Sequence, residues 1–387
     1  MTCTYVNNVL KSFIFILLLI NAKISCSFQI SLFNKLNTIY KEYNIIISPL
    51  SIFQAISLVA NGANDKTQKE LLKLLNNKDM DEINSINFKI LNISKTHSSL
   101  KIANAIICKS EPLQLFKNFA RNKYYSEIFP LIRVDEINKW CSKKTHGKIN
   151  KIIEQIHPLT YMMLLNAVYF RGEWLYTFPI QKTSKQTFYN LNKFKIEVDM
   201  MQIEESFKYF EDNNLQSVEL QFKNEPISAL ILLPNIKTNI NEFIKLLDKD
   251  EEYLYSIINN MEFKHILLQL PKFEKTYSKS LKEILQLMGV DLPFDKNNAD
   301  FSKIRSEKDI YISDITHKTY LKVNERGTEA AAVSVNDVYI FSLPRMMVVN
   351  RPFLFILRNY KLPKHYDIIF ISKIEEVEKK FITLEDL

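Results

Sequence analysis

Glycine is scarce in this chain. Average usage of about 7% would give roughly 27 glycines at this length, yet only five occur among the 387 residues. Glycine adopts positive φ and permits close backbone approach without steric cost, so each of the five is a candidate for such a need. Four stand at expected turns or helix ends. The fifth, Gly327, opens a stretch of tiny residues near the end of the chain.

The motifs of the common catalytic and metal sites are also absent. The chain has no GxSxG, no HExxH, no CxxC pair and no P-loop, and its six histidines are scattered without metal-ligand spacing. We therefore expect no enzyme activity, no catalytic residues, no cofactor and no metal. The formal net charge is +8, but the charges are dispersed, and no basic run with interleaved aromatics points to a nucleic-acid partner.

One apolar run, Phe13–Ile20, follows Lys11 near the N-terminus. It is too short to span a bilayer comfortably and fits the central region of a secretory signal peptide. Cleavage after Cys26, with Ile24 and Cys26 at the two restricted positions, would leave 27–387 as the mature chain. We expect a secreted, extracellular protein without membrane contact after cleavage; an uncleaved anchor is the alternative.

Cysteine is too rare to build a disulfide scaffold. Removal of residues 1–26 leaves only Cys108 and Cys141. Both are expected to be buried small hydrophobic residues, although a single bridge between them stays open. The sequon at Asn92 is a candidate for one N-glycan.

The order of expected elements indicates an α+β fold. A helix is expected over 48–62, where Ser48 can cap, Pro49 suits the first turn and Gly62 suits the end. The apolar run 161–170 is typical of a central strand buried on both faces. Strands dominate later, without regular alternation with helices. No repeat or low-complexity linker appears, so we expect a single domain over 27–387.

Several strings, taken together and in this order, resemble the serpin family of serine protease inhibitors. They include "NIIISPLSI" (44–52), "LLNAVYFRGEW" (164–174), "ISDITHKTYLKVNERGTEAAA" (312–332) and "NRPFLFIL" (350–357). The resemblance covers essentially all of the mature chain. It implies the serpin fold, with three β-sheets, about nine helices and an exposed reactive loop at about 325–350. Two departures stand out: the segment between Tyr125 and Asn138 is shorter than usual, and Ser372 replaces a usual glycine.

The resemblance also implies a mechanism. A protease cuts the exposed loop and becomes acylated, and the freed loop inserts as a new strand of the large sheet and deforms the protease, driven by strain stored in a metastable native state. The implied hinge residues are Glu325, Gly327, Thr328, Glu329, Ala330, Ala331 and Ala332. Ser48, Ser51, Asn166 and His317 match the polar cluster beneath the opening sheet, and Trp174 matches the tryptophan where insertion begins. The alternative role of the four polar residues is ordinary buried hydrogen bonding, and that of Trp174 is core packing.

Residue alternation shows that this segment is able to enter a sheet. A strand places successive side chains on opposite faces. The set that starts at Thr328 is uncharged and begins with four small residues, whereas Glu329 and Asp337 fall in the other set. The segment can therefore insert with the Thr328 set buried and the acids in solvent.

Two counts based on family spacing give the same reactive bond. Thirteen positions after Thr328 and eleven before Pro352 both give Phe341, so the bond is Phe341–Ser342. An aromatic residue there suits chymotrypsin-like proteases. Tyr339 is a rival of the same specificity class, and Arg345 would imply trypsin-like targets.

These observations predict a monomeric, secreted suicide-type inhibitor whose partner is a chymotrypsin-like serine protease. The chain is rich in asparagine, lysine and isoleucine, which suggests an AT-rich genome and the hypothesis of a parasite acting on a host protease. The alternative is a non-inhibitory serpin that acts as a carrier, binding or chaperone-like protein.

Overall fold

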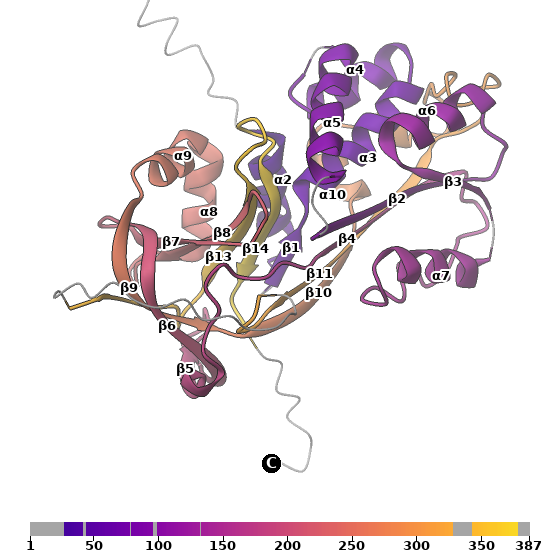
Figure 1. Cartoon of the computed structure of the whole chain (residues 1–387). Helices are drawn as coiled ribbons and strands as arrows, with labels where there is room; N and C mark the ends of the chain where they lie inside the picture. The colour runs from indigo at the N-terminus through magenta and orange to yellow at the C-terminus, as the bar shows by residue number, and fades with distance from the viewer. Residues whose placement is uncertain are drawn as a thin grey trace, which may run out of the picture.

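The computed structural model describes residues 27–41, 44–77, 79–95, 99–131, 133–327 and 343–377. This part of the chain forms nine α-helices and two large sheets (Figure 1). The helices are α2 (Phe28–Tyr40), α3 (Pro49–Gly62), α4 (Asp65–Leu74), α5 (Met80–Lys95), α6 (Gln114–Tyr124), α7 (Val134–Lys144), α8 (Ile240–Lys249), α9 (Glu251–Asn259) and α10 (Lys282–Leu287). The helix count and the α+β class agree with the prediction.

The first sheet has five strands in the order β10, β11, β4, β2, β3. Their bounds are β2 (Leu100–Cys108), β3 (Glu127–Pro130), β4 (Met162–Phe170), β10 (Phe273–Ser280) and β11 (Ile312–Val323). Every residue of β4 is buried, which confirms the prediction of a central strand covered on both faces. The short segment before α7 leaves β3 only four residues long.

The second sheet has nine strands. Its order is β1, β14, β13, β8, β7, β6, β9, β12, and β5 pairs with β6. The bounds are β1 (Asn44–Ile47), β5 (Ser184–Tyr189), β6 (Lys195–Glu211), β7 (Leu215–Gln221), β8 (Ile227–Pro234), β9 (Glu262–Pro271), β12 (Arg345–Val348), β13 (Phe353–Asn359) and β14 (Ile368–Ile374). Three sheets were expected. Two groups of strands merge here because β6, at 17 residues, pairs with β9 along its middle and with β7 near its end.

Helices cover both faces of the five-stranded sheet. Helices α3 to α6 lie on one face and α7 on the other (Figure 1). Helix α3 is buried along nearly all of its length, and Ser48 caps it by accepting a hydrogen bond from the Ser51 backbone N–H at 3.4 Å. It ends at Gly62, where a Cβ would lie 2.2 Å from the Ile304 side chain. The predicted helix is therefore confirmed, and its last glycine is required by packing.

The two cysteines of the described residues, Cys108 and Cys141, are free and buried. Cys108 belongs to the core between the sheet and α3–α6, whereas Cys141 belongs to the core between the sheet and α7. Because the sheet separates the thiols, the bridge that the sequence left open does not form. Burial raises the pKa of both thiols to about 12, so both are inert hydrophobic side chains, as predicted.

Three further sequence features can be placed relative to this fold. The predicted signal peptide, 1–26, lies outside the described residues. Asn92 is exposed in the last turns of α5, and Ser372 is buried in β14. Among the helices described here, none is both long enough and apolar enough to cross a membrane.

Candidate functional site at the junction of β4 and β11

Strands β4 and β11 run parallel and pair directly with each other. Their register extends from Ile312 opposite Met162 to Tyr320 opposite Tyr169. No described strand stands between them, so this junction of the sheet is closed. Strand β11 then leads through 324–327 to the small residues that begin at Thr328.

Gly327 ends the described segment that follows β11, in a tightly packed turn. Its φ is +103°, and a Cβ would lie 2.3 Å from the carbonyl oxygen of Gly172 and 2.8 Å from the backbone nitrogen of Trp174. Both the left-handed backbone and the close approach exclude larger residues. The same turn is held by the Trp174 N–H, which donates to the Arg326 carbonyl at 3.2 Å.

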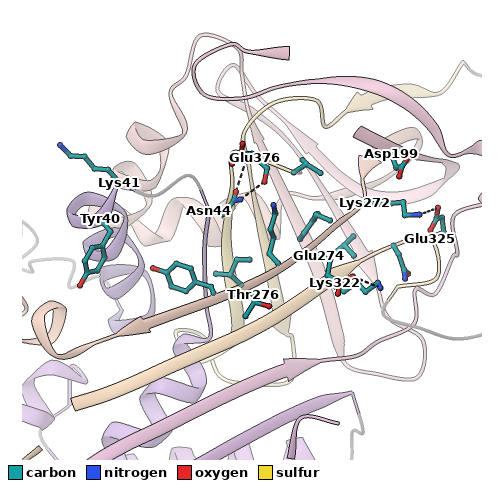
Figure 2. A pocket seen from close by; sticks show the side chains of 17 residues that line it. Tyr40, Lys41, Asn44, Asp199, Lys272, Glu274, Thr276, Lys322, Glu325 and Glu376 are labelled. Atoms are coloured by element: carbon teal, nitrogen blue, oxygen red, sulfur yellow. Dashed lines mark hydrogen bonds and ion pairs between the residues drawn. The ribbon is translucent and has the colours of Figure 1, made fainter. Parts of the chain in front are cut away.

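The carboxylate of Glu325 ties this turn to two other segments. It accepts a hydrogen bond from Thr183 Oγ1 at 2.9 Å and forms an ion pair with Lys272 Nζ at 3.0 Å. Burial raises the pKa of Glu325, but hydrogen bonds from its own backbone, Lys272 and Thr183 outweigh burial and hold this pKa below its ordinary value. Figure 2 shows the pair at one end of an open cleft of about 1080 Å³, which is also lined by Lys322 and Glu274.

Trp174 packs beside the same turn. Its side chain is almost fully buried and stacks on Phe222, with ring centroids 4.3 Å apart. The indole Nε1–H donates to the Asn324 carbonyl at 3.0 Å. Trp174 therefore combines core packing with a direct hydrogen bond to the end of β11.

The structure brings the four predicted polar residues together at the centre of the sheet. Asn166 of β4 lies opposite His317 of β11, and its amide donates to the Ser51 carbonyl at 3.3 Å and to Ser51 Oγ. The Ser48 N–H donates to His317 Nε2 at 3.2 Å. All four side chains are fully buried. The N-terminus of α3 is thereby joined to both strands of the closed junction.

Sequence reasoning missed one member of this cluster. Asn104 of β2 lies opposite Asn166, and its side-chain oxygen accepts a hydrogen bond from the Asn166 amide. A polar row therefore crosses β2, β4 and β11 through Asn104, Asn166 and His317. No local pattern marks Asn104, because its place depends on the register of two strands that lie far apart in sequence.

His317 is neutral in this environment. Its Nε2 accepts from Ser48, so the ring proton resides on Nδ1, which donates to Asn166 Oδ1. Complete burial lowers the pKa of His317 to about 3, because the charged ring would lose its solvation. The hydrogen bond across the junction is therefore present throughout the physiological pH range.

The predicted reactive bond and most of the hinge lie outside the described residues. These are Phe341 and Ser342 of the bond, and Thr328, Glu329, Ala330, Ala331 and Ala332 of the hinge. Both ends of the interval are placed. One end is Gly327, and the other leads to Arg345, which begins β12 and pairs with β9. Arg345 also forms an ion pair with Glu211.

The parallel pairing of β4 with β11 decides how an added strand would pair at this junction. Within the described ranges, no group of three or more histidine, cysteine, aspartate or glutamate side chains is arranged to hold a metal ion. A chain that turns back after β11 and enters the junction would run antiparallel to both β4 and β11. One parallel pairing would thus be replaced by two antiparallel pairings, which are slightly more stable per residue.

Comparisons with known proteins agree with this geometry. A family model described as serpin (serine protease inhibitor) matches residues 23–376. Intracellular coagulation inhibitor 2 of Tachypleus tridentatus is 31% identical, with 86% of each chain covered. The native state of tengpin, a thermophilic serpin, has a TM-score of 0.81 at 29% identity, with 92% of this chain and 93% of that chain covered. Thyroxine-binding globulin in complex with thyroxine has a TM-score of 0.82 at 25% identity, with 92% and 99% covered. The family match spans both sheets and the buried polar cluster, and this chain therefore belongs to the serpin family.

Proposed function

We propose that this serpin is a secreted suicide-type inhibitor of chymotrypsin-like serine proteases. The closed junction between β4 and β11 is the observation that carries the proposal. Cleavage of the segment after β11 would free it to enter that junction as a sixth strand. The target protease would be carried along as an acyl-enzyme and deformed before the ester is hydrolysed.

The hinge sequence supports insertion. The strand that would enter the sheet buries the set of Thr328, Ala330 and Ala332, which are small and uncharged. Thr328→Arg would place a charge at the first buried position, which costs several kcal/mol and slows insertion. We expect this variant to be cleaved as a substrate without forming the complex. An unchanged stoichiometry of inhibition would contradict the alternation argument.

The position of β12 supports Phe341–Ser342 as the reactive bond. Arg345, the rival for trypsin-like specificity, pairs with β9 as part of β12 and is bonded to Glu211. Phe341 and Tyr339 precede that strand, and both suit the apolar primary pocket of chymotrypsin-like enzymes. The specificity class is therefore the same for either residue.

Incubation with chymotrypsin tests the proposal directly. We expect a complex that survives denaturant, and a released peptide that starts at Ser342 and ends at Leu387. Phe341→Arg should shift inhibition towards trypsin and leave the hinge unaltered. A peptide that starts at Ile340 would move the bond and keep the specificity class. A peptide that starts at Met346 would overturn the chymotrypsin-like specificity. Clean cleavage without a complex would overturn the proposal that the protein is an inhibitor.

Secretion rests on the apolar run near the N-terminus. We expect protein recovered from the culture medium to lack residues 1–26. Secreted material that still begins at Met1 would contradict the signal-peptide assignment. The high content of asparagine, lysine and isoleucine suggests a protease of a host organism as the target. A panel of host proteases extends the chymotrypsin test.

A binding or carrier function is the second candidate. Its support is the close structural match to thyroxine-binding globulin, a protein solved in complex with thyroxine. The two candidates differ in what cleavage of the loop does to stability. A large rise in melting temperature after cleavage supports insertion and inhibition, whereas an unchanged melting temperature supports the carrier.

A further inference from the structure

Glu251 holds a buried carboxylate against the first described residue of the chain. Glu251 begins α9, and only 2% of its side chain is exposed. Its Oε2 accepts a hydrogen bond from the Ser27 backbone nitrogen at 2.6 Å, and its Oε1 accepts one from Ser27 Oγ at 2.7 Å. Both polar atoms of Ser27 that can donate are therefore directed at one carboxylate, 224 positions away in the sequence.

Ser27 is itself buried at the start of α2. It is 7% exposed and occupies the N-cap position; its hydroxyl makes no capping hydrogen bond and donates to Glu251. A carboxylate at this place is favoured by the positive ends of α2 and α9. Burial of a carboxylate costs free energy, and a positive charge against it offsets part of that cost.

The sequence analysis independently predicts Ser27 as the first residue after signal-peptide cleavage. Hydrolysis of the Cys26–Ser27 bond by a signal-processing peptidase consumes one water and leaves a carboxylate on Cys26. Ser27 keeps the nitrogen as a primary amine, which takes up a proton at neutral pH. The amide N–H that now faces Glu251 would thereby become an ammonium group, and the hydrogen bond would become charge-assisted.

We propose that Glu251 is the receptor for the new N-terminus of the processed chain, so that removal of residues 1–26 creates a buried ion pair between the Ser27 ammonium and the Glu251 carboxylate. This inference rests on the secretion part of the proposed function. Processing would then have a structural consequence. In the precursor, a neutral hydrogen bond joins α2 to α9, and in the processed chain an ion pair joins them.

Other titratable groups surround this pair. The ring of His365 lies 3.2 Å from Glu251 Oε1 through Nδ1, and 40% of its side chain is exposed. Tyr255 donates to Asp367, and burial, followed by the charges of Asp367 and Glu251, raises the pKa of Tyr255. Asp248 of α8 accepts from Ser31 one turn along α2. The carboxylates Glu251 and Asp248 favour the charged amine, whereas a protonated His365 would compete with it.

The test compares chains with and without a free amine at Ser27. One chain is released from a fusion so that it begins at Ser27, and the other carries four alanines ahead of Ser27. Each is prepared as wild type, as Glu251→Gln and as Glu252→Gln. The last is a matched control, because Glu252 is the exposed neighbour that pairs with Lys364.

The readout is the urea unfolding midpoint between pH 6 and pH 10. An α-amine ordinarily titrates at about 7.7–8.0, and a counter-charge raises that pKa in the folded state. The added stability is therefore fully present below pH of about 7.5 and is lost as pH rises through the raised pKa. We expect the free-amine chain to have an unfolding constant about tenfold smaller at neutral pH. The advantage should vanish in Glu251→Gln and persist in Glu252→Gln.

Each possible failure identifies a different part of the proposal. Equal stability of the two chains at every pH, or equal effects of the two substitutions, would overturn the pairing. N-terminal sequencing of secreted protein that begins elsewhere than Ser27 would overturn the processing site. A failure to inhibit any protease would remove the proposed function but leave both of these results standing.

Discussion

Replacing Asn166 with alanine should destabilise the closed form of the protein far more than the loop-cleaved form. In the closed form, Asn166 accepts from His317 across the β4–β11 junction and donates to Asn104 and Ser51. The substitution leaves the ring N–H of His317 and the side-chain oxygen of Asn104 buried without these partners. Each of these two losses costs about 1–3 kcal/mol, so we expect about 2–6 kcal/mol in total.

Insertion of a strand between β4 and β11 would separate Asn166 from His317. The hydrogen bond across the junction would then already be lost in the cleaved wild type, and the same substitution should cost only about 1–3 kcal/mol there, for the lost bond to Asn104. The assay is chemical unfolding of intact protein and of protein cleaved in the loop by a non-target protease. Comparing the two forms isolates the part of the effect that depends on a closed sheet.

Asn138 provides the matched control. It is a buried asparagine of α7 whose side chain bonds the backbone of Ile152 and Ile153, and none of these three hydrogen bonds reaches β4 or β11. Asn138→Ala should destabilise both forms by similar amounts. If Asn166→Ala also affects both forms equally, the polar row does not hold the sheet closed and the reasoning is refuted.

Three further predictions concern the turn that follows β11 and the buried histidine. Gly327→Ala should cost more than Gly289→Ala in urea unfolding: both have positive φ, which costs about 1–2 kcal/mol, but only Gly327 also meets backbone atoms. Equal costs would contradict the close approach. Glu325→Lys should destabilise the protein, and adding Lys272→Glu should restore part of the loss, because the pair is then reversed; no recovery would argue against the pair. His317, with its pKa lowered to about 3 from 6.5, binds its proton only when unfolded over that interval. Stability should therefore fall by about 1.4 kcal/mol per pH unit below about pH 6.5, and His317→Gln should remove this part of the slope.

Local sequence patterns were sufficient for the elements that carry a strong signal. The continuous apolar run predicted β4 because a strand covered on both faces needs apolar residues at every position. The cap, proline and terminal glycine predicted α3 to within one residue. The long strand β6 was not singled out, although its buried and exposed residues partly alternate. Its length and its two sets of neighbours explain why two expected sheets are joined.

The arrangement of the candidate site depends more on the register of paired strands than on any local sequence pattern. Family resemblance named Asn166 and His317, but only the pairing of β4 with β11 places them opposite each other. The same is true of Glu325, whose partner Lys272 follows the end of β9. Ion pairs and polar rows of this kind join residues distant in sequence, and no periodicity within either segment indicates the partner.

The segment 328–342 is anchored at both ends, which explains why insertion into the sheet would require cleavage. The segment follows Gly327, four residues after the end of β11, and leads to β12, which pairs with β9 of the other sheet from Arg345 to Val348. An intact segment can enter the junction fully only if β12 leaves that edge. In the proposed mechanism, hydrolysis at Phe341 would free the hinge end without disturbing β12. Three local contacts would then oppose entry of the strand into the junction: the turn at Gly327, the ion pair of Glu325, and the hydrogen bond between His317 and Asn166. An advancing strand could break these contacts one after another.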